Sequence, residues 1–150
     1  MTAEIEIQLA STVTHLPDDE ELRKWASATL RDAEKNSVVI RLVDSEESRQ
    51  LNNDYRGLDK PTNVLSFPFS APAEIAGNRL LGDIVICAPV VEQEAREQHK
   101  PVAAHWAHMV VHGMLHLQGY DHLDDEEAEE MERLERRILA TLGVPDPYST

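Results

Sequence analysis

The sequence lacks several features that would indicate a secreted or membrane protein. It has one cysteine, Cys87, so no intrachain disulfide can form, and this favours a reducing compartment. Its N-terminus has neither the basic segment nor the apolar segment of a signal peptide. The longest apolar runs, such as residues 84–91, are far too short to span a membrane. These absences predict a cytoplasmic protein with no membrane association.

Positive charge is also scarce, with 14 lysines and arginines against 28 acidic residues and a net charge of −14. The excess is uneven: residues 121–135 carry nine acids and one base, whereas residues 36–120 carry ten acids and seven bases. No broad positive field is therefore present to attract nucleic acid. A polyanionic substrate must be held by a local patch, by a metal ion or through a partner protein. The acidic run is predicted to be a solvated helix face.

The chain of 150 residues is long enough to form one domain, residues 1–150, with a sizeable core. Alternating or β-branched apolar runs predict four strands, at about residues 4–9, 37–43, 64–67 and 81–87. Helical spacing and capping residues predict five helices, at about residues 18–35, 45–55, 90–98, 101–117 and 124–142. Residues 70–79 are predicted to form an exposed loop. The predicted fold class is α+β, a small mixed four-stranded sheet packed with helices.

Three histidines stand at an uncommon spacing in the segment His112-Gly113-Met114-Leu115-His116-Leu117-Gln118-Gly119-Tyr120-Asp121-His122. On a helix, His112 and His116 share one face, with roughly 5–6 Å between their Cβ atoms, so that both can bind one ion. Gly119 can end the helix in a left-handed turn and bring His122 back to the same point. Three neutral imidazoles with an open fourth position are typical of a catalytic zinc. The segment predicts a site holding one Zn²⁺ on a helix.

The same histidine spacing occurs in metzincin proteases, in which the residue after the first histidine is a glutamate that activates the zinc-bound water. Gly113 occupies that position here, which argues against ordinary peptidase chemistry. Three neutral ligands leave the charge of the ion uncompensated, and this suits an anionic phosphodiester and lowers the pKa of a bound water to about 7. Zinc is favoured by geometry and availability, although imidazoles also accept nickel or copper.

Three further residues each have two interpretations. His108 lies on the same helical sector as His112 and either assists a ligand or the substrate, or is a packing histidine. Asp121 either orients a ligand imidazole or caps the following helix. Asp83, near a strand end, is either a base or a buried, hydrogen-bonded carboxylate.

The histidine segment is similar to the signature of the YbeY family of bacterial metal-dependent endoribonucleases. Two further blocks agree: Leu51-Asn52 and Tyr55-Arg56-Gly57 followed by Asp59-Lys60-Pro61-Thr62-Asn63-Val64-Leu65-Ser66-Phe67-Pro68, and Leu81-Gly82-Asp83-Ile84-Val85-Ile86. The resemblance covers about residues 50–122 and extends to the length and the order of elements. It implies an α+β fold with a zincin-like histidine metal site on a helix, zinc ligands at His112, His116 and His122, and a functionally important arginine at Arg56.

The resemblance further implies cleavage of single-stranded RNA, with roles in maturation of the 3′ end of 16S rRNA and in ribosome quality control. RNA and the ribosome or its proteins are the implied partners. Arg56 is then expected to grip a phosphate bidentately, and its alternative role is to cap a helix C-terminus. Lys60, Thr62 and Asn63 either line the same groove or stabilise a turn.

Two other functions stay open on the sequence alone. One is a ribosome assembly factor that acts mainly by binding proteins, since basic ribosomal proteins would complement the acidic helix. The other is a zinc hydrolase of small substrates or peptides. Water and the RNA's own 2′-hydroxyl are both candidates for the nucleophile.

Overall fold

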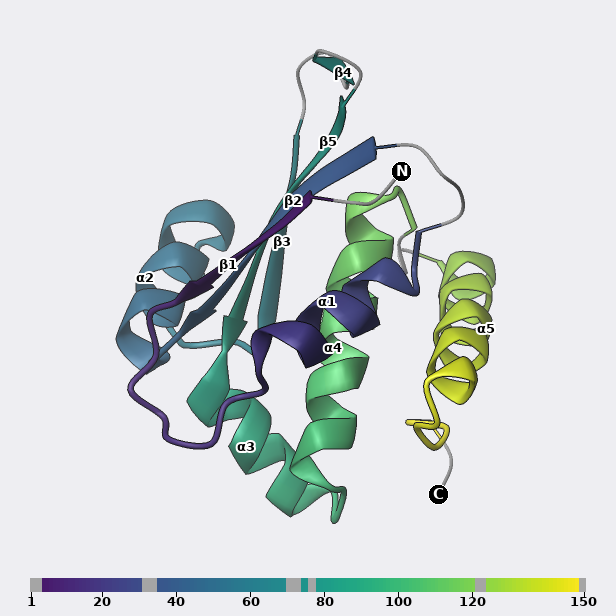
Figure 1. The fold of residues 1–150 in the computed structure, drawn as a ribbon. Coiled ribbons are helices and arrows are strands. Elements are labelled where there is room, and N and C mark those ends of the chain that lie inside the picture. Colours follow the sequence, from purple (N-terminus) through teal and green to yellow (C-terminus); the bar gives the residue numbers. More distant parts are fainter. Residues whose placement is uncertain (1–3, 31–34, 70–73, 76–77, 121–123, 149–150) are drawn as a thin grey trace.

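The computed structural model describes residues 4–30, 35–69, 74–75, 78–120 and 124–148, and their helices and strands follow an α+β order (Figure 1). The strands are β1 (Glu4–Leu9), β2 (Lys35–Val43), β3 (Val64–Pro68), β4 (Glu74–Ile75) and β5 (Asn78–Cys87). The helices are α1 (Asp19–Ser27), α2 (Ser45–Arg56), α3 (Ala88–Glu97), α4 (Val102–Leu117) and α5 (Asp125–Thr141). The predicted fold class is confirmed.

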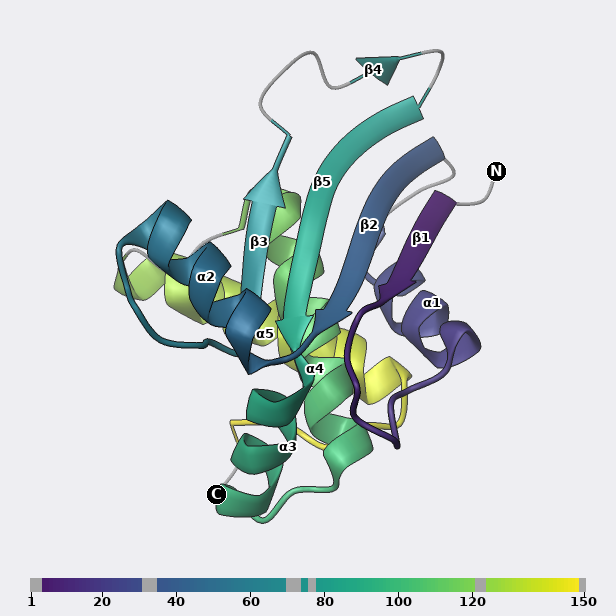
Figure 2. The same cartoon turned by 90° about the vertical axis from the view of Figure 1, so that its left-hand side faces the viewer.

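The sheet is mixed and has the strand order β1-β2-β5-β3 (Figure 2). β1 runs parallel to β2 and β2 runs parallel to β5, whereas β3 is antiparallel to β5 and forms an edge of the sheet. These are the four predicted strands. The two-residue β4 pairs with the start of β5 and lies within the predicted 70–79 loop.

Helices cover both faces of the sheet. α2 lies on one face, where its Leu51 packs against a small cluster formed by Val43, Leu65, Val85 and Cys87. α1 and α4 lie on the other face, and α5 packs on the outer side of α4 (Figure 1). α4 is thus enclosed between the sheet and α5, which explains why it is so apolar. No helix formed by the described residues is long and apolar enough to span a membrane.

The ends of α1 show where sequence patterns succeed and fail. Its start is fixed by a capping box, in which the Asp18 carboxylate accepts a hydrogen bond from the Glu21 amide at 2.8 Å. The helix ends at Ser27, and the Thr29 hydroxyl donates to the Ala26 carbonyl just beyond that end. The predicted end near residue 35 was wrong, because β2 already begins there.

Candidate metal centre

Four histidines form a row along α4: His105, His108, His112 and His116. The ring centroids of successive histidines lie 6.0, 6.1 and 4.7 Å apart. His105 and His108 are buried, whereas His112 and His116 are half-buried. The row confirms that these residues share one sector of the helix. Its closest pair, His112 and His116, is the pair predicted to bind a metal together.

Gly113 lies where α4 packs closely on the sheet. A Cβ atom at this position would lie 3.0 Å from Cγ2 of Ile84 and 3.3 Å from Cγ2 of Val64. The Gly113 carbonyl also accepts a hydrogen bond from the Ser66 hydroxyl of β3 at 3.4 Å. A glutamate here would point into the core rather than toward a metal. The structure therefore gives a packing reason for the absence of the protease base.

Glu135 of α5 reaches across to the histidine row and is fully buried. Its Oε2 accepts hydrogen bonds from Nε2 of His108 at 2.8 Å and from Nδ1 of His112 at 3.1 Å. Its Oε1 accepts a hydrogen bond from the Tyr148 hydroxyl at 2.7 Å. Both oxygens are therefore satisfied, as a buried carboxylate requires.

These contacts fix the charge on the cluster. Burial by itself would raise the pKa of Glu135, but the hydrogen bonds and charges of His108 and His112 outweigh it and bring that pKa to about 2. Burial, the hydrogen bond to Glu135 and nearby acids raise the pKa of Tyr148 far above its ordinary value of 10.0. Near neutral pH, Glu135 is therefore an ionised acceptor and Tyr148 a neutral donor.

The same contacts select the histidine tautomers. His108 donates from Nε2, and its buried Nδ1 has no hydrogen-bond partner among the described residues. A lone pair on Nδ1 suits that environment better than a buried N–H. In a neutral His112 that donates from Nδ1, the lone pair lies on Nε2. This is the neutral form that a divalent metal binds.

Sequence reasoning missed Glu135, because it belongs to the acidic run predicted to be a solvated face. Glu126, Glu129 and Glu130 of that run are indeed exposed. Glu135, however, lies four residues after Met131 and four before Leu139, and both are buried. An acid within an apolar helical stripe was the available signal.

A metal ion could be held by the group formed by His108, His112 and Glu135, whose ligand atoms all lie within 4.8 Å of one another. The ring of His116 lies beside that of His112. Imidazole and carboxylate donors together fit zinc and other divalent transition metals. His122 and Asp121 lie outside the described residues, so the third predicted ligand stays a prediction.

The loop that precedes β3 is held by hydrogen bonds to neighbouring helices. The Ser48 hydroxyl bonds both the carbonyl and the amide of Thr62 at 3.0 Å, and the Asn52 side-chain amide donates to the Lys60 carbonyl at 2.8 Å. Asn63 donates to Glu94, whose Oε1 also bonds Nε2 of His105 at 2.8 Å. The polar loop residues thus fit the interpretation as a stabilised turn.

Arg56 is the last residue of α2 and is exposed, and Gly57 ends the helix in a left-handed conformation, φ 70°. The preceding Tyr55 packs edge-to-face on Phe67 of β3, with ring centroids 4.9 Å apart. β3 also contacts α4, through Ser66 and Gly113. The end of α2 and the histidine segment of α4 therefore meet the same edge strand, from opposite faces of the sheet (Figure 2).

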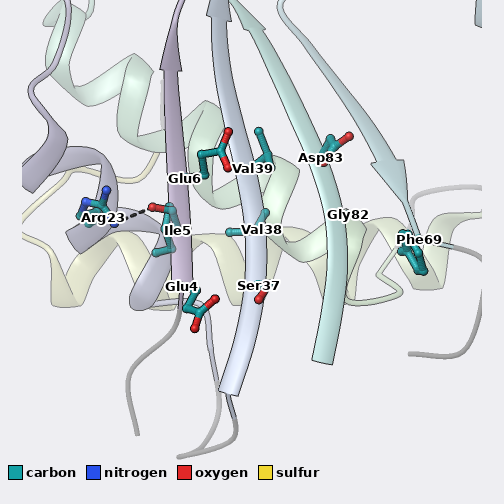
Figure 3. A pocket seen from close by; sticks show the side chains of 10 residues that line it. All are labelled: Glu4, Ile5, Glu6, Arg23, Ser37, Val38, Val39, Phe69, Gly82 and Asp83. Atoms are coloured by element: carbon teal, nitrogen blue, oxygen red, sulfur yellow. Dashed lines mark hydrogen bonds between the residues drawn. The ribbon is translucent and has the colours of Figure 1, made fainter. Parts of the chain in front are cut away.

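Asp83 is not the buried carboxylate that one of its two interpretations predicted. It is exposed and lies on the sheet face opposite to that of its neighbour Ile84, which packs against α4. Together with Glu4 and Glu6 it lines an open pocket of about 560 Å³ (Figure 3). Burial, and then the charge of Glu6, raise the pKa of Asp83. This carboxylate is thus part of an acidic surface away from the histidine row.

Comparison with known proteins agrees with this architecture. The structure is similar to the solution structure of TM1509 from Thermotoga maritima, with a TM-score of 0.53 and 26% sequence identity over 97% of this chain and 99% of that one. The family model described as endoribonuclease YbeY matches residues 6–143 and therefore nearly the whole chain. That match implies an endoribonuclease, and hence a nuclease that acts in rRNA processing. Because this family model spans nearly the whole chain, including α4 and α5, the chain belongs to the YbeY endoribonuclease family.

Proposed function

We propose that this protein is a zinc-dependent endoribonuclease that cleaves single-stranded RNA during 16S rRNA 3′-end maturation and ribosome quality control in the cytoplasm. The observation that carries the proposal is the pairing of His112 with His116, in which Nδ1 of His112 is held by the buried Glu135. Family membership supports the RNA substrate. His112, His116 and His122 are the proposed ligands of the ion.

A bound zinc would supply a Lewis acid and a water with a pKa near 7. The residues of the chain have the remaining tasks. His112 and His116 present imidazoles from one helix face and would hold the ion together with the predicted ligand His122. Arg56 is proposed to hold the scissile phosphate or its neighbour, because a guanidinium can bind two phosphate oxygens at once. Its exposed position at the end of α2 leaves it accessible to RNA.

Tyr55 suggests how a single strand is recognised beside Arg56. Its side chain is 69% exposed although it is a large aromatic residue, and Phe67 supports it from β3. Unpaired bases stack on exposed aromatic rings, each stack contributing about 1–3 kcal/mol. A base that stacks on Tyr55 would place its own phosphate within reach of the neighbouring arginine. This arrangement favours single-stranded over duplex substrates.

A second candidate function, binding of ribosomal proteins during assembly, is favoured by the pocket in which three acids, Glu4, Glu6 and Asp83, stand against one base, Arg23 (Figure 3). A basic protein segment would complement this surface. Glu6 and Asp83 point from the sheet face away from α4, so protein binding and cleavage can coexist. Binding that persists in His116→Ala would identify it as a separate activity.

The test is cleavage of an RNA fragment that carries the 3′ end of 16S rRNA, by purified protein with its metal content measured. Wild type is compared with His116→Ala, Arg56→Ala and, as a matched control, His15→Ala, which replaces an exposed histidine outside α4. We expect cleavage by wild type and by the control only, and its loss in a chelator. End-group analysis then identifies the nucleophile, since a 2′,3′-cyclic phosphate points to the 2′-hydroxyl. Cleavage by metal-free His116→Ala would refute the proposal.

A further inference from the structure

We propose that Glu135 is a positioning residue that orients the metal ligand His112, and that the C-terminal segment completes this support through Tyr148. The inference rests on the proposed function in taking His112 as a ligand. It assigns a task to α5 and to the residues after it, which lie outside the histidine motif.

The geometry of Glu135 is that of a hydrogen-bonding partner. Its Oε2 lies 2.8 Å from Nε2 of His108 and 3.1 Å from Nδ1 of His112. Two donor atoms bound to one tetrahedral ion at about 2.0–2.1 Å would stand roughly 3.3 Å apart, which is farther than Oε2 lies from either of these nitrogens. A metal bound at Oε2 would also have to displace both N–H groups. We therefore assign Glu135 to the imidazole of His112 rather than to the ion.

The charge on Glu135 strengthens this role. A carboxylate that accepts from Nδ1–H fixes the orientation of the ring and makes Nε2 a better donor to a metal. His108 shares the same oxygen and thereby holds the carboxylate in one rotamer. Since Glu135 is fully buried, water does not compete for it.

Tyr148, in the C-terminal segment, binds the second carboxylate oxygen of Glu135. Its hydroxyl donates to Oε1 at 2.7 Å. The Tyr148 amide donates to Asp146 at 2.8 Å, and the guanidinium of Arg136 lies 5.3 Å from the centre of the Tyr148 ring. Lys100 donates to the Pro147 carbonyl at 2.9 Å and anchors the segment to the loop before α4. Several independent contacts thus bring this hydroxyl to the carboxylate.

The test is a titration of metal-free protein with Co²⁺, followed by its visible absorption, which reports affinity and ligand geometry without RNA. Glu135→Gln keeps the shape of the side chain and removes its charge. Tyr148→Phe removes a single donor. Glu130→Gln is the matched control, because it removes an exposed carboxylate from the same helix. We expect about 10- to 100-fold weaker binding in Glu135→Gln and a smaller loss in Tyr148→Phe, with a changed spectrum in both, while Glu130→Gln matches wild type.

Three results would overturn the inference. The first is wild-type affinity and spectrum in folded Glu135→Gln and Tyr148→Phe. The second is complete loss of the ion in Glu135→Gln, as in His116→Ala. The third is an ion that His116→Ala retains and His108→Ala loses. The second result would make Glu135 a ligand, and the third would place the ion in the group formed by His108, His112 and Glu135. If Glu135→Gln does not fold, Tyr148→Phe alone decides. Wild-type protein that binds Co²⁺ as described but leaves RNA uncut would refute the proposed function and support the positioning role.

Discussion

Gly82 is the position at which the structure predicts the most severe effect of adding one carbon atom. Its φ is +136°, a conformation that residues with a side chain rarely adopt. A Cβ atom there would lie less than 2.5 Å from the Phe67 carbonyl oxygen and 3.0 Å from the Cα of Pro68. Both atoms belong to the backbone of β3, so no side-chain rotation relieves the overlap. Gly82→Ala must therefore push the end of β3 away from β5.

Two costs add in this variant. The left-handed conformation costs about 1–2 kcal/mol for a residue with a Cβ. Relief of the overlap adds about 1–3 kcal/mol, as in other overpacked sites. Gly143→Ala provides the matched control, because Gly143 also has a positive φ, 76°, but has open space around its Cβ position. Only the first cost applies there, so the difference between the two variants isolates the clash with β3.

The assay is urea unfolding followed by circular dichroism, with thermal unfolding as a second measurement. We expect Gly82→Ala to lose about 3–4 kcal/mol of unfolding free energy, which corresponds to a decrease in Tm of about 10 °C for a chain of this length. Gly143→Ala should lose about 1–2 kcal/mol, the conformational cost alone. Equal losses in the two variants would show that β3 accommodates the extra carbon, and the close packing of β3 on β5 would then have to be reconsidered.

Three other predictions follow from particular contacts. The hydrogen bond from His105, opposed by burial and assisted by Asn63, lowers the pKa of Glu94 below its ordinary 4.5, so Glu94→Gln should cost about 2 kcal/mol at neutral pH. This difference from wild type, read from urea unfolding at several pH values, should shrink as pH falls below 4.5, because the unfolded state then takes up a proton that the folded state, with its lower pKa, still refuses. A constant difference would contradict it. Tyr55→Ala should weaken binding of single-stranded RNA about tenfold in an anisotropy titration, whereas Tyr55→Phe should keep it. Gly113→Glu should unfold the protein without creating peptidase activity, measured by circular dichroism and peptide cleavage, and a folded variant would contradict the packing against Ile84.

The elements that the sequence predicted well are those whose pattern reflects one local environment. The four main strands alternate or are wholly apolar, because each lies in a sheet covered by helices. α4 is apolar along most of its length because it is enclosed on two sides. The end of α1 was predicted too late, since the apolar stripe continues to Leu30, which packs on the core beyond the helix. The spacing of apolar residues indicates which residues are buried, and buried residues continue past the end of the helix.

The site divides in the same way. His112 and His116 could be predicted to lie together because four residues on one helix fix their separation. Glu135 and Tyr148 could not, since their contacts with the histidine row depend on how α5 and the following segment pack on α4. No local pattern contains that information. The apolar neighbours of Glu135 indicate only that it is buried, and the partner that makes its burial possible is known from the tertiary structure alone.

The division of charge indicates from which side RNA approaches. Glu135 is the one acid of residues 124–135 that the structure uses inside the protein, where three donors offset its charge. The exposed acids of α5 repel a polyanion, and α5 lies on the opposite side of the molecule from α2 (Figure 1). Arg56 and Lys60 are exposed at the end of α2 and in the loop after it. We therefore expect RNA to reach the histidines along the edge of β3 from the α2 side, with the acids of α5 limiting how far the strand extends past the site.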